Sequence, residues 1–150
     1  MPIVNSIFLA LVLLTAPSQR EVVIMPIPTS DAIDLARMIA RNEGYDVTKT
    51  TIYYFDLLAS QGKPFHAGYT SIGFDINGNT RNLISINDST GQAIDYNTCE
   101  IFDYPDLRPF QERRTRLNKV KRKTAQELAA DVGCTPPRVL TKPVSRTARR

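Results

Sequence analysis

The sequence predicts an α+β fold: one N-terminal helix packed on an antiparallel sheet of three to four strands, followed by a basic, partly helical C-terminal extension. Helical periodicity near residue 30 precedes segments of alternating apolar residues between residues 51 and 96. A chain of 150 residues, 42% hydrophobic and 23% charged, has the size and composition of one globular domain. The net charge is −6 over residues 1–107 and +10 over residues 108–150, and no aromatic residue follows Phe110. We therefore place the end of the folded body near residue 110.

Residues 1–18 are typical of a signal peptide. The unbroken apolar stretch from Ile7 to Leu14 is shorter than the roughly 20 residues that a membrane span needs. Small residues then lead to a cleavage site before Gln19, although the first six residues contain no lysine or arginine. A buried N-terminal strand or helix is the alternative. We expect a secreted or periplasmic protein with a mature body over 19–110, an extension over 111–150, and no transmembrane segment after cleavage.

The first element of the body is an amphipathic helix that begins near Pro28. Thr29 and Ser30 offer a capping hydroxyl, and Asp31 places an acid in the first turn. Gly44 is suited to the position just past the C-terminus. The apolar positions recur at helical spacing, at Ala32, Leu35, Ala36 and Ile39. This stripe predicts a short helix that packs closely on a sheet.

Strands rich in β-branched and aromatic residues follow the helix. We expect them at residues 51–58, 69–76, 81–87 and 92–96. Asn77-Gly78-Asn79 predicts a hairpin turn, and Gly91 suits a left-handed position in a second turn. A helix followed by consecutive strands predicts a helix on one face of an antiparallel meander.

These elements together resemble a PepSY domain. The resemblance lies in the spaced alanines Ala32, Ala36 and Ala40, the Gly44-Tyr45 step with Val47, and the segment 84–94, which ends in a strand, Asp88 and Thr90-Gly91. It covers about residues 30–96. It implies an extracytoplasmic binding or inhibitory module that acts on peptidases or within the cell envelope. The family has no catalytic residues to carry over, and the segment after residue 110 departs from it.

Cys99 and Cys134 are the only cysteines. In an oxidising compartment the expected state of such a pair is a disulfide, which here would tie the basic extension to the body. Two unrelated buried thiols are the alternative, and a nucleophilic pair with His66 has less support. Two cysteines and one histidine exclude a four-thiolate zinc site and a multi-histidine metal centre. We expect no metal and no cofactor.

The largest electrostatic feature is a basic run after residue 110. It consists of Arg113, Arg114, Arg116, Lys119, Lys121, Arg122 and Lys123. Such a run binds anionic polymers through counterion release, or it forms a solvated, partly helical linker that offsets an acidic body. No aromatic residue interleaves the run, which argues against stacking on single-stranded nucleic acid.

Residues 124–142 support an alternative function, a helix-turn-helix that binds nucleic acid. Thr124 and Glu127 form a capping box, and Leu128, Gly133 and Val139 have the spacing of that motif. However, Pro136-Pro137 and Pro143 leave room only for a very short recognition helix. Our main interpretation is a short helix near residues 125–132 that positions Cys134.

Three carboxylates, Glu100, Asp103 and Asp106, support a second alternative, a small hydrolase. The preferred interpretation of this segment is an ordered edge on which Phe102, Tyr104 and Phe110 pack against the body. We therefore predict a non-catalytic binding module that takes a peptidase or an anionic envelope polymer as its partner, rather than nucleic acid. Its binding surface would be the open sheet face or the loop at residues 62–68. The sequence leaves the oligomeric state open.

Overall fold

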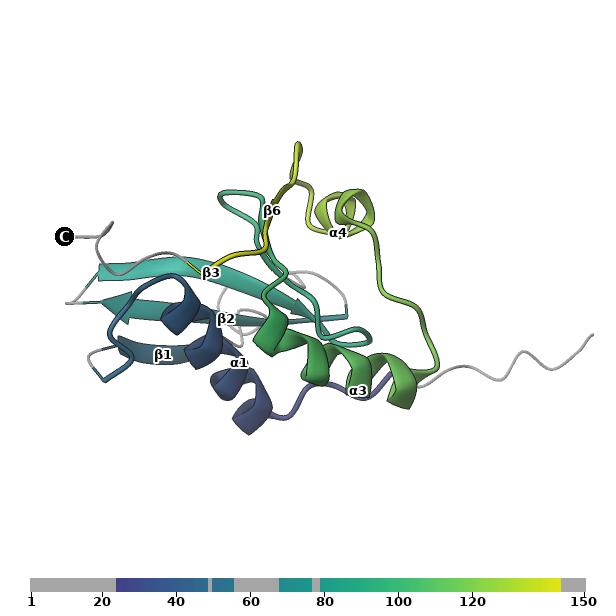
Figure 1. The fold of residues 1–150 in the computed structure, drawn as a ribbon, viewed down its shortest axis with the longest axis horizontal. Helices are drawn as coiled ribbons and strands as arrows, with labels where there is room; N and C mark the ends of the chain where they lie inside the picture. The colour runs from purple at the N-terminus through teal and green to yellow at the C-terminus, as the bar shows by residue number, and fades with distance from the viewer. Residues whose placement is uncertain (1–23, 49, 56–67, 77–78, 144–150) are drawn as a thin grey trace, which may run out of the picture.

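The computed structural model describes residues 24–48, 50–55, 68–76 and 79–143. These residues form three α-helices and one six-stranded sheet in the order β1-β2-β3-β4-β5-β6 (Figure 1). The strands are β1 (Thr50–Phe55), β2 (Tyr69–Ile76), β3 (Asn79–Asn87), β4 (Ala93–Asp95), β5 (Glu100–Phe102) and β6 (Arg138–Leu140). The helices are α1 (Thr29–Asn42), the 3-10 turn η1 (Pro105–Leu107), α3 (Arg108–Asn118) and α4 (Ala125–Asp131).

The α+β class is confirmed, but the sheet is larger than predicted. It has six strands in place of three or four, and the last pair, β5 and β6, is parallel. The sixth strand comes from the segment that the sequence assigned to the extension. It was missed because three residues ending at Leu140 carry almost no strand signal of their own.

Helix α1 occupies Thr29–Asn42 and buries its apolar stripe against the sheet. The predicted capping hydroxyl is wrong: Pro28 is the N-cap and no side chain caps the helix. Gly44 lies past the C-terminus with φ +83, the left-handed conformation that glycine adopts without strain. The small side chains of Ala36 and Ala40 allow the helix to lie close to β2.

The long hairpin of β2 and β3 provides the second and third strands of the sheet. The two strands are antiparallel and pair Ile76 with Asn79, so the hairpin connection falls at residues 77–78, which lie outside the described residues. The register shifts between Gly73 and Phe74. Ile72, Phe74, Ile84 and Ile86 are fully buried and pack in the same core cluster as α1. Two-residue alternation along β2 sends Ser71 to the opposite face.

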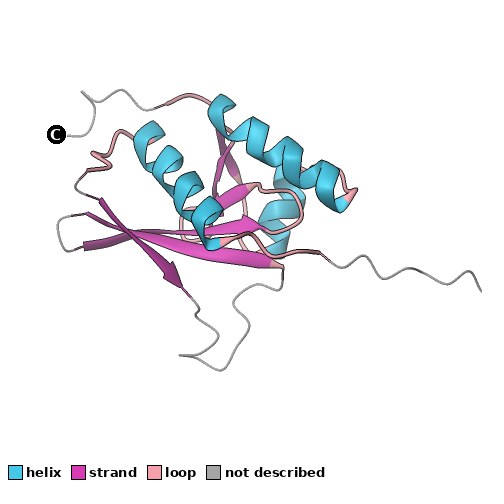
Figure 2. Cartoon of the chain, turned by 90° about the horizontal axis from the view of Figure 1, so that it is seen from below, coloured by secondary structure: helices cyan, strands magenta, loops and turns pink. Residues whose placement is uncertain are grey.

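Helix α3 lies where the sequence predicted a solvated, partly helical linker, but it packs on the body instead of being solvated. Pro109 lies in its first turn, and Lys119 ends it in the left-handed conformation with φ +54. Its buried side chains recur at helical spacing, at Phe110, Gln111, Arg114 and Asn118. Three of these four are polar, so the stripe does not stand out as hydrophobic. The helix lies on the same side of the sheet as α1 (Figure 2).

Helix α4 packs on the other face of the sheet, where Leu128 and Ala129 meet Ile94 and Ile101. The capping box of Thr124 and Glu127 is confirmed. The helix-turn-helix alternative is wrong: after Gly133 the chain forms strand β6, not a recognition helix. Among the described residues, no helix is long and apolar enough to cross a membrane.

Candidate protein-binding groove

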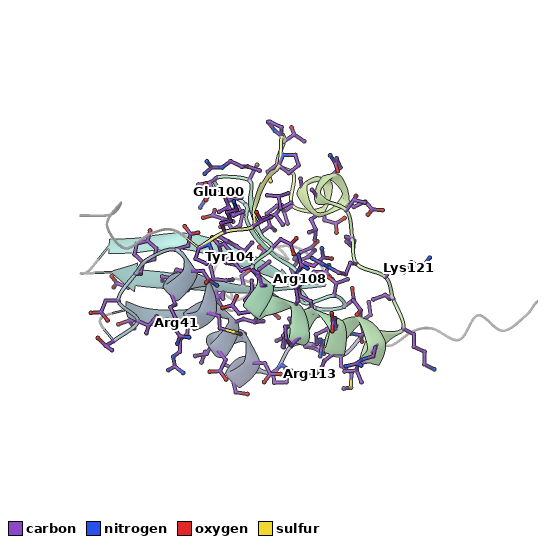
Figure 3. All side chains as sticks on the ribbon, in the orientation of Figure 1. Arg41, Glu100, Tyr104, Arg108, Arg113 and Lys121 are labelled. Atoms are coloured by element: carbon purple, nitrogen blue, oxygen red, sulfur yellow. The ribbon has the colours of Figure 1, made fainter. Side chains whose placement is uncertain are left out.

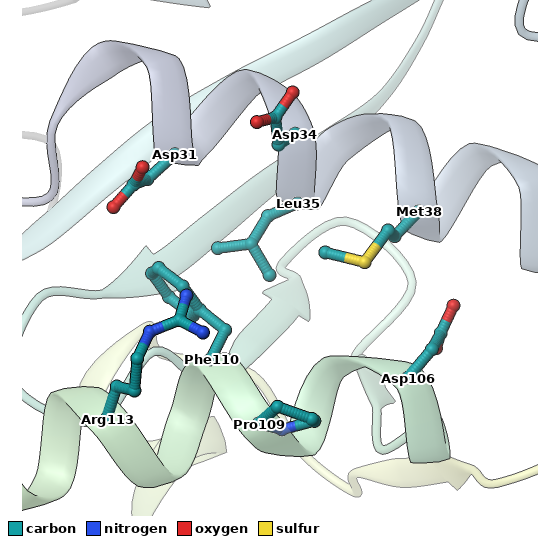
Figure 4. Close-up of a pocket in the computed structure, with 8 residues that line it drawn as sticks. All are labelled: Asp31, Asp34, Leu35, Met38, Asp106, Pro109, Phe110 and Arg113. Atoms are coloured by element: carbon teal, nitrogen blue, oxygen red, sulfur yellow. The ribbon is translucent and has the colours of Figure 1, made fainter.

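A groove lies between α1 on one side and η1 and α3 on the other (Figure 4). Its inner part has a volume of about 260 Å³ and is lined by Asp31, Asp34, Leu35, Met38, Asp106, Pro109, Phe110 and Arg113. An outer part of about 370 Å³ is lined by Met25, Pro26, Pro28, Asp31, Phe110, Arg113, Arg114 and Leu117. Asp31, Phe110 and Arg113 line both parts. We call the whole feature the α1–α3 groove.

The outer part of the groove is an exposed apolar surface. Met25 is 52% exposed and Leu117 is 55% exposed, and both line this part. Ile24, at 43%, directly precedes Met25. Of the four exposed large hydrophobic side chains among the described residues, two line this part, Ile24 is next to one of them in sequence, and Val139 lies on β6. Clustering of this kind marks interaction surfaces, because isolated exposed apolar residues are ordinary and contiguous ones are not.

Charged groups of opposite sign face each other across the groove. Asp31 on α1 and Arg113 on α3 lie on opposite sides, with Phe110 between them (Figure 4). Arg113 stacks over the Phe110 ring with its guanidinium carbon 5.6 Å from the ring centroid. Asp106 accepts two hydrogen bonds from Asn42 Nδ2, at 2.9 and 3.0 Å, and has no ion pair with any described residue. Among the described residues, Asp34 pairs only with exposed Arg37, at 3.4 Å.

The base of the outer part is held rigidly by buried Arg114. Its guanidinium donates hydrogen bonds to the carbonyl of Asp88, with Nε at 3.0 Å, and to the carbonyl of Met25. Gly91 in the same turn has φ +71, and a Cβ there would lie 2.7 Å from the Phe110 ring. Only glycine therefore fits beneath Phe110. The Met25 segment and Phe110 are thus positioned before any partner binds.

The turn that receives Arg114 is itself closed by Asn87. Its Oδ1 accepts hydrogen bonds from the backbone N–H groups of Ser89 and Thr90 at 3.1 and 3.0 Å, and from both hydroxyls. Asn118 Nδ2 donates to the Ser89 carbonyl at 3.0 Å. The turn that the sequence predicted at residues 88–91 therefore holds α3 in place, because its carbonyl groups accept hydrogen bonds from Arg114 and Asn118.

The seven basic residues predicted to bind anions lie on α3 and in the segment after it, and they have different surroundings; Arg113 and Lys121 are labelled in Figure 3. Arg114 is only 5% exposed and is used internally. Arg122 pairs with Asp103 at 2.8 Å, and Lys123 pairs with Asp131 at 2.5 Å. Arg116, Lys119 and Lys121 are exposed and have no ion pair with any described residue. Arg113 is also exposed, but its guanidinium lies over the Phe110 ring. Anion binding by the run stays a prediction, with Arg116, Lys119 and Lys121 as its remaining free cations in the described part of the chain.

The three carboxylates considered for a hydrolase, Glu100, Asp103 and Asp106, each form an ion pair or hydrogen bond that links two different segments of the fold. Glu100 on β5 pairs with Arg138 on β6. Asp103 pairs with Arg122 and, at 3.7 Å, with Arg108. Asp106 joins η1 to α1 through Asn42. The predicted packing of Phe102, Tyr104 and Phe110 on the body is confirmed, since all three belong to the main core cluster.

Cys99 and Cys134 are free thiols in the structure, and the disulfide between them stays a prediction. The two side chains nevertheless pack in one cluster below α4. Burial, and then a hydrogen bond with Cys99, raise the pKa of the Cys134 thiol to about 12. A thiol with so high a pKa is a poor nucleophile. His66, the other residue considered for such a pair, lies outside the described residues.

A buried acidic pair lies at the centre of the fold. Glu43 accepts a hydrogen bond from the Tyr104 hydroxyl, and Asp95 accepts from the backbone N–H groups of Asn97 and Thr98 at 2.9 and 3.2 Å. Burial raises the pKa of Asp95 and the charge of Glu43 adds to the rise, while the two backbone hydrogen bonds oppose it. Within the described residues, no group of three or more histidine, cysteine, aspartate or glutamate side chains is placed to hold a metal ion.

Comparison with known proteins identifies a fold but no family. No family model and no curated protein matches the chain, so the PepSY resemblance is not confirmed. The chain is similar to one chain of a solved type VI secretion system effector–immunity complex from Pseudomonas protegens. The two are 21% identical, with a TM-score of 0.58 over 74% of this chain and 92% of that chain. At this identity the likeness establishes a shared fold.

Proposed function

We propose that this protein is a binding module that recognises another protein, in the manner of an immunity protein that neutralises a secreted effector. The observation that carries the proposal is the fold shared with a chain of an effector–immunity complex, over almost the whole of that chain. The exposed apolar groove supports it, since protein partners bind such surfaces. Glu100, Asp103 and Asp106 form ion pairs or hydrogen bonds within the fold, and this structural use also favours binding over hydrolysis.

Expression in bacteria tests this proposal. The chain is expressed alone and together with each toxic type VI effector of its own host. We expect the chain alone to be harmless and one effector to lose its toxicity when the chain is present. The pair should then elute as a stable complex in size-exclusion chromatography with light scattering. Growth arrest by the chain alone would assign it to the effector side, and a failure to neutralise any effector would contradict the proposal.

The place where binding occurs is a separate proposal. We infer from residues 1–18, which lie outside the described residues, that the chain is exported and meets its partner in the periplasm or outside the cell. There Cys99 and Cys134, already in one cluster, would be oxidised to a disulfide. Intact mass with and without reduction tests both points. A chain that begins with Met1 and has two free thiols in its native host would contradict them.

The peptidase and the anionic envelope polymer remain candidate partners of the same module. Each makes a different demand on the surface. A polymer would bind through Arg116, Lys119 and Lys121, and its affinity would fall steeply with salt. A protein partner that uses the apolar groove would keep most of its affinity at high salt, so a salt titration separates the two.

A further inference from the structure

We propose that the α1–α3 groove is the docking site for a segment of the partner protein that presents apolar side chains beside lysine or arginine. This inference rests on the proposed function and specifies the surface and the chemistry of the partner. The occupant is a chain segment because the two parts of the groove, about 260 and 370 Å³, share Asp31, Phe110 and Arg113, so a ligand that fills both must extend from the residues before α1 to η1.

The apolar component of the partner follows from the outer part. Met25 and Leu117 are each more than half exposed, and Pro26 and Pro28 line the same part. An apolar side chain placed there removes these surfaces from water. The surface is also prepared in advance, because Arg114 holds the Met25 carbonyl and the Phe110 ring lies against Gly91. Ordering costs on binding are therefore low, which favours affinity.

The basic component follows from the carboxylates. Asp31, Asp34 and Asp106 all line the inner part; Asp34 already pairs with Arg37, and Arg113, the cation among the described lining residues of this part, faces the Phe110 ring. Asp31 has no hydrogen bond or ion pair to any described residue, and Asp106 is held by a neutral amide. A partner lysine or arginine would supply the missing positive charge. Complementary charge of this kind sets the register of a bound segment and speeds its association.

Short synthetic helical peptides test the proposal without knowledge of the natural partner. Each peptide carries a pair of leucines one turn apart, flanked by arginine, by glutamine or by glutamate. Binding to the full chain is measured by NMR titration. We expect the arginine peptide to bind at least about ten-fold more tightly than the glutamate peptide. Its shifts should map to residues 25–31 and 110–117, and added salt should reduce the difference between the peptides.

Matched variants of the chain locate the site. Leu117→Glu places a charge in the apolar part and Asp31→Lys reverses the acidic part, and we expect each to weaken the arginine peptide at least about ten-fold. Val139→Glu changes the fourth exposed hydrophobic residue, on β6, and should leave binding unchanged. Leu117 and Val139 are exposed, and Asp31 is half-buried in the first turn of α1, so circular dichroism checks that each variant folds as the parent does.

Several results would overturn the proposal. These are equal affinity for arginine and glutamate peptides, no binding of the arginine peptide, or loss of binding with Val139→Glu alone. A homodimer that Leu117→Glu dissociates would assign the groove to a second copy of the chain and also overturn it. The proposed function fails separately: if no effector is neutralised but the arginine peptide binds, the groove is a docking site for another kind of protein. If an effector is neutralised equally by the parent and by Leu117→Glu, the module binds through another surface.

Discussion

The two faces of the sheet are covered very differently. Helices α1 and α3 cover one face and join a cluster that contains fifteen buried residues of the described chain, among them Phe74 and Tyr104. Helix α4 covers the other face only near β4 and β5, with six buried residues in its cluster. The short strands β4 and β5 serve both, since Ala93 and Phe102 face the larger cluster while Ile94 and Ile101 face the smaller one. We infer from this difference that packing on the first face provides most of the stability of the fold, whereas packing on the second face attaches the C-terminal segment to the sheet.

The largest expected effect is on the first face. Phe74→Ala removes a fully buried ring from the large cluster and should cost about 3–5 kcal/mol of the free energy of unfolding. Urea denaturation measures it, with Val139→Ala, at an exposed position, as a control that should stay within about 0.5 kcal/mol of the parent. A loss below about 1 kcal/mol for Phe74→Ala would mean that this cluster does not dominate stability.

On the second face, Leu128→Ala should cost less and act locally. Leu128 is fully buried, but the small cluster around it can partly close, so we expect about 2–3 kcal/mol. Hydrogen exchange should accelerate in α4 and β6 and stay unchanged in the β2–β3 hairpin. Equal acceleration in both regions would show that the two faces unfold as one unit.

Gln92 links the two regions through a single side-chain amide. It donates to the Lys123 carbonyl at 2.9 Å and accepts from the Lys123 N–H at 2.7 Å. Gln92→Glu keeps the acceptor but sets a carboxylate against that carbonyl, so we expect a loss of about 1–3 kcal/mol. Gln126→Glu, the same change at an exposed position of α4, is the control. An equally small effect of both changes would show that Gln92 does not fix the α3–α4 connection.

The smallest effect concerns pH and the buried Asp95. Because its pKa is raised in the folded state, the folded chain binds its proton more tightly than the unfolded chain does. Stability from this residue is therefore present at acidic pH and falls as pH rises above about 3.8 through the folded pKa. Asp95→Asn keeps acceptors for the N–H groups of Asn97 and Thr98 and removes this dependence. We expect the variant to gain stability relative to the parent between pH 4 and pH 7, measured by thermal unfolding; a constant difference across that range would contradict it.

Local chemistry explains how much of this fold could be predicted. The strand Tyr69–Ile76, the turn at Gly91 and the capping box at Thr124 are specified by residues a few positions apart, and the structure has all three. The packing of helix α3 on the body was missed because three of the four side chains on its buried face are polar, and the partners of Arg114 and Asn118 lie far away in sequence. Arg114 looks like one cation in a basic run until the Asp88 carbonyl is placed beside it.

The candidate groove was harder still to predict. Phe110 was expected to pack on the body, and it does. Nothing in the sequence brings Met25 and Leu117 to one surface, since the contact depends on the α1–α3 arrangement. An exposed Leu117 in a charged helix was a signal that could have been noticed. Its significance depends on a second exposed hydrophobic residue that only the tertiary structure supplies.

The parallel pairing of β5 and β6 also affects how the chain folds. Strand β5 pairs first with its neighbour in sequence, β4, whereas β6 reaches it only after α3 and α4 have been made. Contacts between neighbours in sequence form quickly, and contacts between distant segments form slowly. During synthesis, the β2–β3 hairpin and the strands beside it can therefore assemble before β6 is available. The last strand then closes an existing edge, and until it does, β5 is a temporary site for mispairing with other chains.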